Sequence, residues 1–226
     1  MRVLAIDTAL EACAAAVFDT ERDVVVSETL PMVRGHAEAL MPLIARVMQR
    51  ARVQFDAIDR IAVTTGPGSF TGLRVGISAA RGIALAAGKP AVGLTTLATY
   101  AAPLIAKDDS TPIAVVVDAR HQHVYMQLFG PAGRTLVAPR IAGVRDAARM
   151  AANGPVRIVG SAAKLLAEAW PAREPPPIAV EELPAPDVAW VARLGAAATE
   201  PLTAPKPLYL RAPDAQPQDA ARLPRR

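Results

Sequence analysis

The segment Ile61-Ala-Val-Thr-Thr-Gly-Pro-Gly-Ser-Phe-Thr-Gly-Leu-Arg-Val-Gly-Ile-Ser-Ala-Ala-Arg-Gly-Ile-Ala-Leu85 decides how the first half of this chain folds. Its β-branched residues between 61 and 65 predict a short buried strand, which Gly66-Pro67-Gly68 ends in a turn. Ser69 or Thr71 then offers a hydroxyl that caps a helix from about residue 72. A strand, a glycine-rich turn and a helix N-terminus can together point backbone N–H groups at an anion. The turn is therefore a candidate anion site.

Three known motifs fail at this turn. No Lys follows the glycines as a phosphate loop requires, and Thr71 stands where a dinucleotide-binding motif has its third Gly. A nucleophile elbow fails because Gly68 directly precedes Ser69. The alternative explanation is a tight turn that needs small residues. Arg74 favours an anion or partner site, because a cation in the first helical turn opposes the helix dipole by about 0.3–1 kcal/mol.

Two helices carry unusual surfaces. In the helix after the turn, small residues recur at every fourth position, and each interior Gly costs about 1 kcal/mol relative to Ala. Such a stripe indicates close packing, either on the protein's own sheet or on a helix of a partner chain. The preceding predicted helix, residues 36–52, is apolar over more than one face, which is typical of a partner surface. The expected contact residues are Leu40, Leu43, Ile44, Val47, Gly72, Gly76 and Ala80.

Composition narrows the class of protein. The chain has 226 residues, of which 52% are hydrophobic, and this is ample material for a core. Cys13 is the single cysteine, so no intrachain disulfide is possible and a reducing cytoplasm is expected. No signal segment is expected before the first strand, and the longest uncharged run, residues 90–106, is too short to span a bilayer. A net charge of +4, partly from Arg222, Arg225 and Arg226, is only weak evidence for a nucleic-acid surface.

The predicted order of elements is duplicated. The chain begins with three predicted strands, at 3–7, 12–19 and 23–29. A helix at 36–52, a strand at 61–65 and a helix at 72–87 come next, and one more strand and helix follow them. A shorter version of this order restarts at residue 113. The sequence therefore predicts a first lobe at 1–108, joined by a helix at 188–198, and a smaller second lobe at 109–187. Residues 201–226 are expected to form a Pro-rich, partly disordered tail. Two duplicated βββαβα lobes, the second abbreviated, make up the α/β architecture of the actin, Hsp70 and sugar-kinase (ASKHA) superfamily.

One block of sequence makes a closer resemblance visible. Residues 59–76, Asp-Arg-Ile-Ala-Val-Thr-Thr-Gly-Pro-Gly-Ser-Phe-Thr-Gly-Leu-Arg-Val-Gly, resemble the bacterial TsaB (YeaZ) family. The segments at 5–8, 117–120 and 207–211 resemble it more weakly, so the resemblance extends from residue 1 to about 211. It implies a non-catalytic subunit that helps to install threonylcarbamoyl on adenosine 37 of tRNAs that decode ANN codons. It also implies a homodimer when the chain is alone, a heterodimer with the catalytic sister TsaD, the ATPase TsaE as a further partner, and contact with tRNA through the complex.

The metal site of the catalytic sister is not expected in this chain. The resemblance aligns residues 94–102 with a segment that carries two metal-binding His four residues apart. Thr95 and Thr99 stand at the nearest matching positions, and Thr hydroxyls are poor transition-metal ligands. His36 lacks a partner one turn later, and His121 and His123 are better explained as surface or turn residues. We therefore expect no catalytic residue and no metal here, with the metal on the catalytic partner.

Nucleotide binding is the harder question. In the superfamily two Asp residues flank the phosphates, and Asp7 and Asp118 occupy those places without the neighbouring glycines that let backbone approach a phosphate. We expect no tightly bound cofactor, with ATP bound only at the level of the complex. A stand-alone small-molecule kinase or ATPase of the same superfamily is the first alternative, and a glycoprotease-like peptidase is the last. The candidate nucleotide or anion residues are Asp7, Thr8, Gly66, Gly68, Ser69, Arg74 and Asp118.

Overall fold

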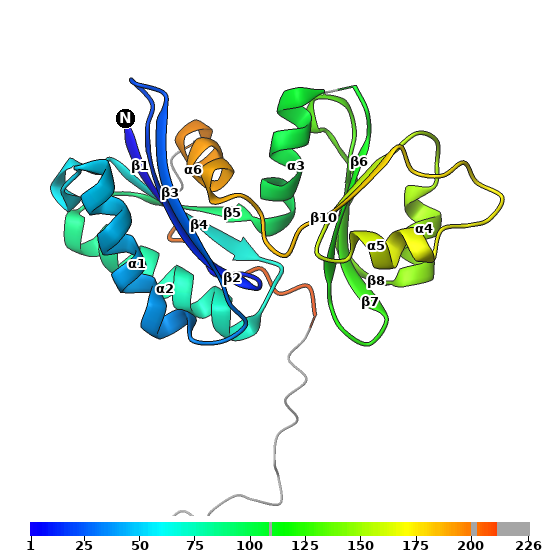
Figure 1. Cartoon of the computed structure of the whole chain (residues 1–226), viewed down its shortest axis with the longest axis horizontal. Coiled ribbons are helices and arrows are strands. Elements are labelled where there is room, and N and C mark those ends of the chain that lie inside the picture. The colour runs from blue at the N-terminus through cyan, green and yellow to red at the C-terminus, as the bar shows by residue number, and fades with distance from the viewer. Residues whose placement is uncertain (109, 200–202, 212–226) are drawn as a thin grey trace, which may run out of the picture.

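The first lobe is a mixed five-stranded sheet, sheet A, with helices on both faces (Figure 1). The computed structural model describes residues 1–108, 110–199 and 203–211. Sheet A has the strand order β3-β2-β1-β4-β5, in which β1 is antiparallel to β2 and parallel to β4. Its strands are β1 (Arg2–Asp7), β2 (Ala12–Asp19), β3 (Val24–Pro31), β4 (Arg60–Gly66) and β5 (Ala91–Thr95), and a 3-10 turn, η1 (Phe55–Ala57), precedes β4.

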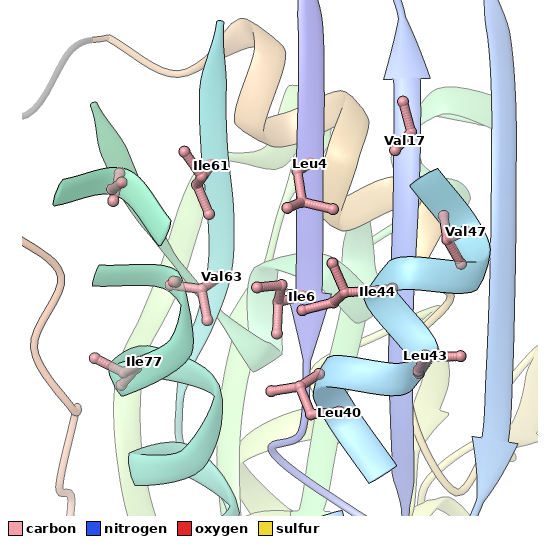
Figure 2. Packing of buried hydrophobic residues seen from close by; sticks show 14 of the residues in the cluster. Leu4, Ile6, Val17, Leu40, Leu43, Ile44, Val47, Ile61, Val63 and Ile77 are labelled. Atoms are coloured by element: carbon pink, nitrogen blue, oxygen red, sulfur yellow. The ribbon is translucent and has the colours of Figure 1, made fainter. Parts of the chain in front are cut away.

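Two long helices cover one face of sheet A. They are α1 (His36–Ala51) and α2 (Phe70–Ala87), and α2 begins two residues before the predicted start because Ser69 is its N-cap. Their apolar sides meet Leu4, Ile6 and Val63 on the sheet in a core that excludes solvent (Figure 2). Burial of these aliphatic side chains, each contributing about 1.5–3 kcal/mol, stabilises the first lobe.

The second lobe contains the same kinds of element as the first, in the same order. Sheet B has the strand order β10-β9-β6-β7-β8, and α4 and α5 pack on one of its faces. The second lobe was predicted to be abbreviated, and its helices α4 and α5 are indeed shorter than α1 and α2. No element is missing from the order, however, because β10 forms inside a Pro-rich stretch. The elements are β6 (Ile113–Asp118), β7 (His123–Phe129), η2 (Pro131–Gly133), β8 (Thr135–Gly143), α4 (Val144–Ala151), β9 (Arg157–Gly160), α5 (Ala163–Glu168) and β10 (Ala179–Glu182).

The last helix of each repeat packs on the other lobe. Helix α6 (Val188–Ala197) lies on the second face of sheet A, where Val188 and Val191 are buried against Ala5 of β1. Helix α3 (Thr96–Lys107) contributes Leu97 and Tyr100 to the core beneath sheet B, although the sequence places it in the first lobe. The two helices contact each other between the sheets (Figure 1). This exchange joins the lobes and leaves a cleft at the carboxyl ends of their central strands.

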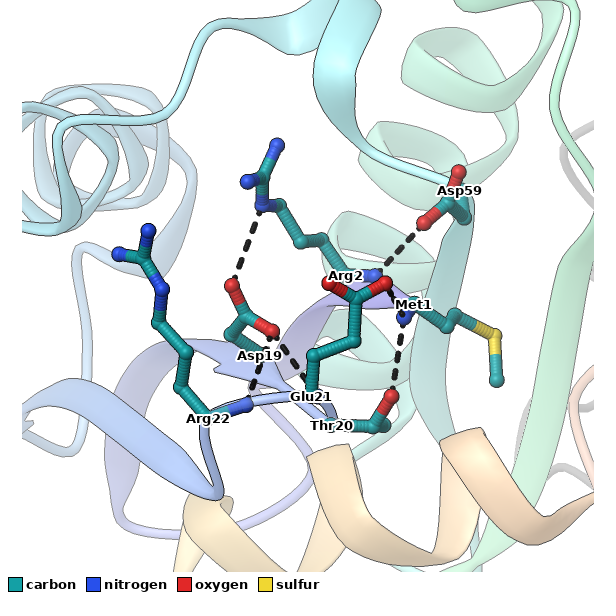
Figure 3. A network of polar contacts seen from close by, with 7 residues as sticks. All are labelled: Met1, Arg2, Asp19, Thr20, Glu21, Arg22 and Asp59. Atoms are coloured by element: carbon teal, nitrogen blue, oxygen red, sulfur yellow. Dashed lines mark hydrogen bonds and ion pairs between the residues drawn. The ribbon is translucent and has the colours of Figure 1, made fainter.

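Polar contacts at the opposite end of sheet A fix the start of the chain (Figure 3). The Asp19 carboxylate accepts hydrogen bonds from the backbone N–H of Glu21 at 3.0 Å and from the Arg2 side chain at 3.3 Å. The N-terminal amino group donates to Thr20 Oγ1 at 2.9 Å. These contacts lie at the start of β1, far from the cleft at its end.

Residues 203–211, here called the strap, pack along the first lobe. The Leu208 N–H donates to the Thr65 carbonyl at 2.7 Å, and Pro205 lies against Gly93, whose missing Cβ would come within 3.1 Å of the Pro205 Cβ. Within the tail that the sequence predicted to be Pro-rich and partly disordered, these residues are therefore packed, because sheet A supplies backbone and side-chain partners for them. The rest of the predicted tail, residues 201–202 and 212–226, lies outside the described residues.

Candidate inter-lobe cleft and partner surface

A cleft of about 420 Å³ lies between the lobes. Its cations already have carboxylate partners. Arg120 lies 3.7 Å from Glu11 of the other lobe and 3.4 Å from Asp118, and Lys164 lies 3.7 Å from Glu182. The cleft therefore offers little unbalanced positive charge to a phosphate. The described residues that line it are Leu10, Glu11, Val33, His36, Gly68, Ser69, Asp118, Ala119, Arg120, Tyr125, Ser161, Lys164, Glu182 and Pro184.

The glycine-rich turn reaches the cleft, but two of its N–H donors are bound within the protein. The Ser69 N–H donates to the Ala9 carbonyl at 2.7 Å, and Ser69 Oγ accepts from the Gly72 N–H at 3.2 Å. Gly68 does not need positive φ; it is small because an added Cβ would lie 2.3 Å from the Ala9 oxygen. These N–H groups are therefore not free to bind an anion, and Gly68 and Ser69 anchor the turn between β1 and β2.

The stripe of small residues on α2 lets the helix pack closely against the turn that follows β1. Thr8 Oγ1 donates to the Gly72 carbonyl at 2.7 Å. A Cβ on Gly72 would lie 2.1 Å from the Thr8 carbonyl oxygen, and one on Gly76 would lie 2.4 Å from Thr8 Oγ1. Of the two explanations for the stripe, packing on the protein's own sheet is the correct one. Gly66 is constrained separately, because its φ is 108° and the Leu208 carbonyl would lie 3.1 Å from its Cβ.

Asp7 lies fully buried beneath the anchored turn. Its Oδ1 accepts hydrogen bonds from Thr64 Oγ1 and from the Ala9 N–H, while its Oδ2 has no hydrogen-bond partner. Burial raises the pKa of the Asp7 carboxyl, although the Thr64 hydrogen bond opposes this change. Asp7 does not line the cleft, so it is not placed to hold a phosphate or its metal ion there.

Asp118 begins the corresponding turn of the second lobe. Its backbone N–H donates to Ser161 Oγ at 3.2 Å, and its Oδ1 accepts from the Arg120 N–H at 2.8 Å. Arg120, His121 and Gln122 adopt left-handed φ values of 63°, 53° and 60°, so side chains occupy a turn where glycines would open the backbone. Gly160, beside Asp118, is required because a Cβ there would lie 2.0 Å from the Val116 carbonyl oxygen.

Arg74 has a different role from the expected one. Its guanidinium lies 3.7 Å from the centre of the Phe70 ring, and its Nε donates to Tyr209 Oη of the strap at 3.2 Å. The rings of Phe70 and Tyr209 are 5.4 Å apart. Contact with an aromatic face stabilises a cation by about 0.5–1 kcal/mol at an exposed site, which offsets the helix dipole. The position of Arg74 therefore does not require an anion.

The His and Thr residues weighed as metal ligands have local partners. His36 Nε2 lies 3.1 Å from the Leu10 carbonyl oxygen, and His123 Nδ1 lies 2.7 Å from the His121 carbonyl oxygen. Thr95 Oγ1 accepts from the Ala98 N–H at 3.1 Å as the N-cap of α3, and Thr99 Oγ1 donates to the Thr96 carbonyl at 2.7 Å. Across residues 1–108, 110–199 and 203–211, the structure places no group of three or more His, Cys, Asp or Glu where it could hold a metal.

The predicted interface residues are core residues of a single chain. Leu40, Leu43, Ile44 and Val47 are at most 1% exposed and pack against sheet A (Figure 2). Gly72, Gly76 and Ala80 are also buried, so the set of contact residues given by the sequence is wrong. The error arose because a helix that is apolar on several sides does not reveal which side meets the sheet. The outer face of α1 and α2 instead presents Met41, 49% exposed, and Leu85, 85% exposed.

The fold and the cleft together define the class of protein. Two repeated α/β lobes with exchanged terminal helices give this chain the fold of the actin, Hsp70 and sugar-kinase superfamily, as predicted. A polyphosphate/ATP-glucomannokinase from Arthrobacter shares the fold with a TM-score of 0.52 over 87% of this chain and 98% of that one, at 12% identity. Within the part of the chain that the structure describes, none of the helices is long and apolar enough to cross a membrane.

Sequence comparison identifies the family. The family model described as "TsaD: tRNA N6-adenosine threonylcarbamoyltransferase" matches residues 29–179. The TsaB protein of Escherichia coli K12 is 38% identical over 125 residues, which are 55% of this chain and 53% of that protein. This chain thus spans about half the length of the curated TsaB relatives that it matches. An uncharacterized protein of Mycobacterium tuberculosis H37Rv is 34% identical over 95% of this chain and 94% of its own length.

A solved structure supports the same assignment over nearly the whole chain. It is a Pseudomonas aeruginosa protein described by its similarity to peptidase YEAZ, and it superposes with a TM-score of 0.79 at 26% identity, covering 93% of this chain and 99% of that one. The chain belongs to the threonylcarbamoyltransferase family and, within it, to the TsaB (YeaZ) group.

Proposed function

We propose that this chain is a non-catalytic subunit of the complex that installs threonylcarbamoyl on adenosine 37 of ANN-decoding tRNAs. The observation that carries the proposal is the anchored turn. Thr8 and Ala9 are hydrogen-bonded to the start of α2 above a buried Asp7. Asp7 is one of the two positions at which the superfamily resemblance implies an Asp beside bound phosphates. Relatives named for tRNA threonylcarbamoyladenosine biosynthesis support the pathway.

The proposal includes partners. The chain pairs with the catalytic sister TsaD, and TsaE joins the pair, while the metal and any bound ATP belong to the complex. Alone, the chain forms a homodimer. The exposed outer face of α1 and α2 is the surface that fits these pairings, because Met41 and Leu85 expose apolar side chains there. This face replaces the buried residues that the sequence favoured.

The two alternatives have less support. A kinase or ATPase needs an open phosphate site, whereas the N–H groups of Ser69, Asp118 and Arg120 are hydrogen-bonded within the protein. A serine peptidase needs an activated nucleophile. Ser69 Oγ accepts the α2 cap hydrogen bond, and His36 Nε2 faces the Leu10 carbonyl rather than a serine.

An omission assay tests the proposal. Purified TsaD, TsaE and this chain are mixed with tRNA and a threonylcarbamoyl donor, and each protein is left out in turn. Modification should require this chain and should be absent when it is the only protein, whatever metal is supplied. Size-exclusion chromatography of the chain with TsaD should give a heterodimer. Robust transfer by this chain alone, or full activity without it, would contradict the proposal.

A further inference from the structure

A depression of about 690 Å³ lies at the carboxyl end of α2, beside the first residues of the strap. Most of the residues that line it are small or apolar, and the two that carry a charge are both cations. Its lining from the side of α2 includes Arg81, Gly82, Leu85 and Lys89. Leu85, which is 85% exposed, also belongs to the outer face of α1 and α2. The depression is therefore continuous with the surface that the proposed function assigns to the partner subunit.

The charge of the depression comes from Arg81 and Lys89. Residues 60–107, which include α2 and β5, contain no Asp or Glu, and neither does the strap. In the described part of the chain, neither cation forms an ion pair. Arg46 on α1, by contrast, lies 2.7 Å from the Glu28 carboxylate. The dipole of α2 places about half a negative charge at this end of the helix, which is less than the two positive charges. The depression therefore keeps a net positive charge.

Gly82 lines the depression without a packing reason inside this chain. It lies within α2, where Gly weakens a helix relative to Ala, and its φ is not positive. A Cβ at Gly82 would meet nothing within 4 Å, whereas a Cβ on Gly72 or Gly76 would collide with Thr8. Gly82 therefore leaves room for atoms that come from outside the chain.

A second copy of this chain complements the charge poorly. Through the same face it presents α1 and α2, which together contain one carboxylate, Glu38. The same two helices contain four arginines, Arg46, Arg50, Arg74 and Arg81. Like charges that meet across an interface cost affinity and so act against the wrong partner. A docking segment with Asp or Glu fits the depression better than a second copy does.

From this charge, the exposed Leu85 and the space beside Gly82 we infer that the depression receives an acidic segment of the catalytic partner subunit. An apolar side chain of that segment packs against Leu85 and Gly82, and its carboxylates meet Arg81 and Lys89. The depression thereby favours the heterodimer over the homodimer. The inference rests on the proposed function, which assigns one face to both pairings, and it adds the chemistry that distinguishes them.

Charge reversal tests the depression. Arg81→Glu/Lys89→Glu reverses both cations, and Arg140→Glu/Arg145→Glu makes the same charge change at exposed positions of the second lobe. The affinity of each variant for TsaD, and for itself, is measured at low and high salt by analytical ultracentrifugation. The first variant should bind TsaD about tenfold more weakly at low salt, and the deficit should shrink at high salt because salt screens the charges. Its homodimer should not weaken, and the second-lobe variant should change the TsaD affinity less than about twofold.

A second variant tests the space rather than the charge. Gly82→Met puts a side chain into the depression at a position where a Cβ meets no other atom of this chain, so the fold is retained. Its melting temperature should be at least that of wild type, because Met is a better helix former than Gly. Its affinity for TsaD should fall about tenfold, because the side chain occupies the place of the partner's segment.

Three results would overturn the inference. They are wild-type affinity of either depression variant for TsaD, equal loss of the homodimer and the heterodimer on charge reversal, and an equal loss by the second-lobe variant. The second result would make the depression a contact between copies of this chain. The proposed function fails separately, in the omission assay. If the charge-reversed variant binds TsaD normally while modification still requires the chain, only the assignment of the depression is wrong.

Discussion

The inter-lobe cleft and the outer face of α1 and α2 differ in how far the chain itself satisfies their side chains. In the cleft, Arg120 and Lys164 lie beside carboxylates, and the Ser69 N–H of the glycine-rich turn donates to the Ala9 carbonyl. On the outer face, Met41 and Leu85 remain 49% and 85% exposed. Exposed apolar side chains are typical of a surface that meets another protein, whereas paired charges leave little free charge for a phosphate.

The largest effect is expected from the anchored turn beside the cleft. Gly72→Ala places a Cβ 2.1 Å from the Thr8 carbonyl oxygen, so backbone must move, and we expect a loss of about 2–4 kcal/mol in the free energy of unfolding. The control is Gly82→Ala on the exposed side of α2, where a Cβ meets nothing within 4 Å. It should stabilise the protein by about 0.5–1 kcal/mol. Urea unfolding of both variants provides the measurement, and equal midpoints would show that the turn is not anchored.

The Asp7 carboxyl, which is buried beneath the anchored turn, provides a second test of that turn. Because burial raises its pKa, the folded state favours the protonated form, and the stability from this group falls as pH rises above the unfolded value of about 3.9. Asp7→Asn keeps an oxygen acceptor and removes the charge. Its melting temperature should therefore rise relative to wild type between pH 4 and pH 8. Parallel pH profiles would mean that Asp7 is not confined as described.

The strap should be held less tightly when its aromatic contact is removed. Tyr209→Ala deletes the hydrogen bond from Arg74 and the contact with Phe70, which together should be worth about 1 kcal/mol at this exposed site. Hydrogen exchange of the Leu208 amide, which donates to Thr65, should become about fivefold faster. Tyr209→Phe keeps the ring and should show a smaller change. Unchanged exchange in Tyr209→Ala would show that the strap is held by other contacts.

The smallest effect is expected at Asp108, far from both regions, and its sign is opposite to that of Asp7. Hydrogen bonds from Ser110 and Thr111 and the nearby Arg157 lower the pKa of Asp108 to about 2. Its stabilising contribution is present above the unfolded value of about 3.9 and is lost as pH falls towards 2. Asp108→Asn should be slightly less stable than wild type at pH 7, and the deficit should shrink below pH 4. A deficit that does not change with pH would contradict the assignment.

Local patterns in the sequence were sufficient for much of the fold. The strands at 3–7 and 61–65, the Ser69 cap and the duplicated order follow from side-chain period and turn residues, which act over a few positions. The exchange of α3 and α6 did not follow, because which sheet a helix covers depends on contacts between distant parts of the chain. For the same reason, the sequence did not show that Leu40 and Val47 point towards the sheet rather than towards a partner chain.

Less of the candidate site than of the fold could be predicted from the sequence. Asp118, Gly68 and Ser69 do line the cleft, but their partners, such as Glu11 for Arg120, come from the opposite lobe and leave no local pattern. The strap was missed because Pro-rich composition predicts disorder, whereas Leu208 and Tyr209 find partners on an existing surface.

The comparison of the cleft with the outer face of α1 and α2 is tested most directly by one reconstituted reaction. The rate of tRNA modification is measured with TsaD, TsaE and either a cleft variant, Asp118→Asn/Lys164→Gln, or an outer-face variant, Met41→Glu/Leu85→Glu. The account predicts a near wild-type rate and an intact TsaD heterodimer for the cleft variant. It predicts loss of the heterodimer and at least a tenfold lower rate for the outer-face variant, because charge replaces exposed apolar side chains there. A lost rate in the cleft variant together with a normal rate and heterodimer in the outer-face variant would contradict it.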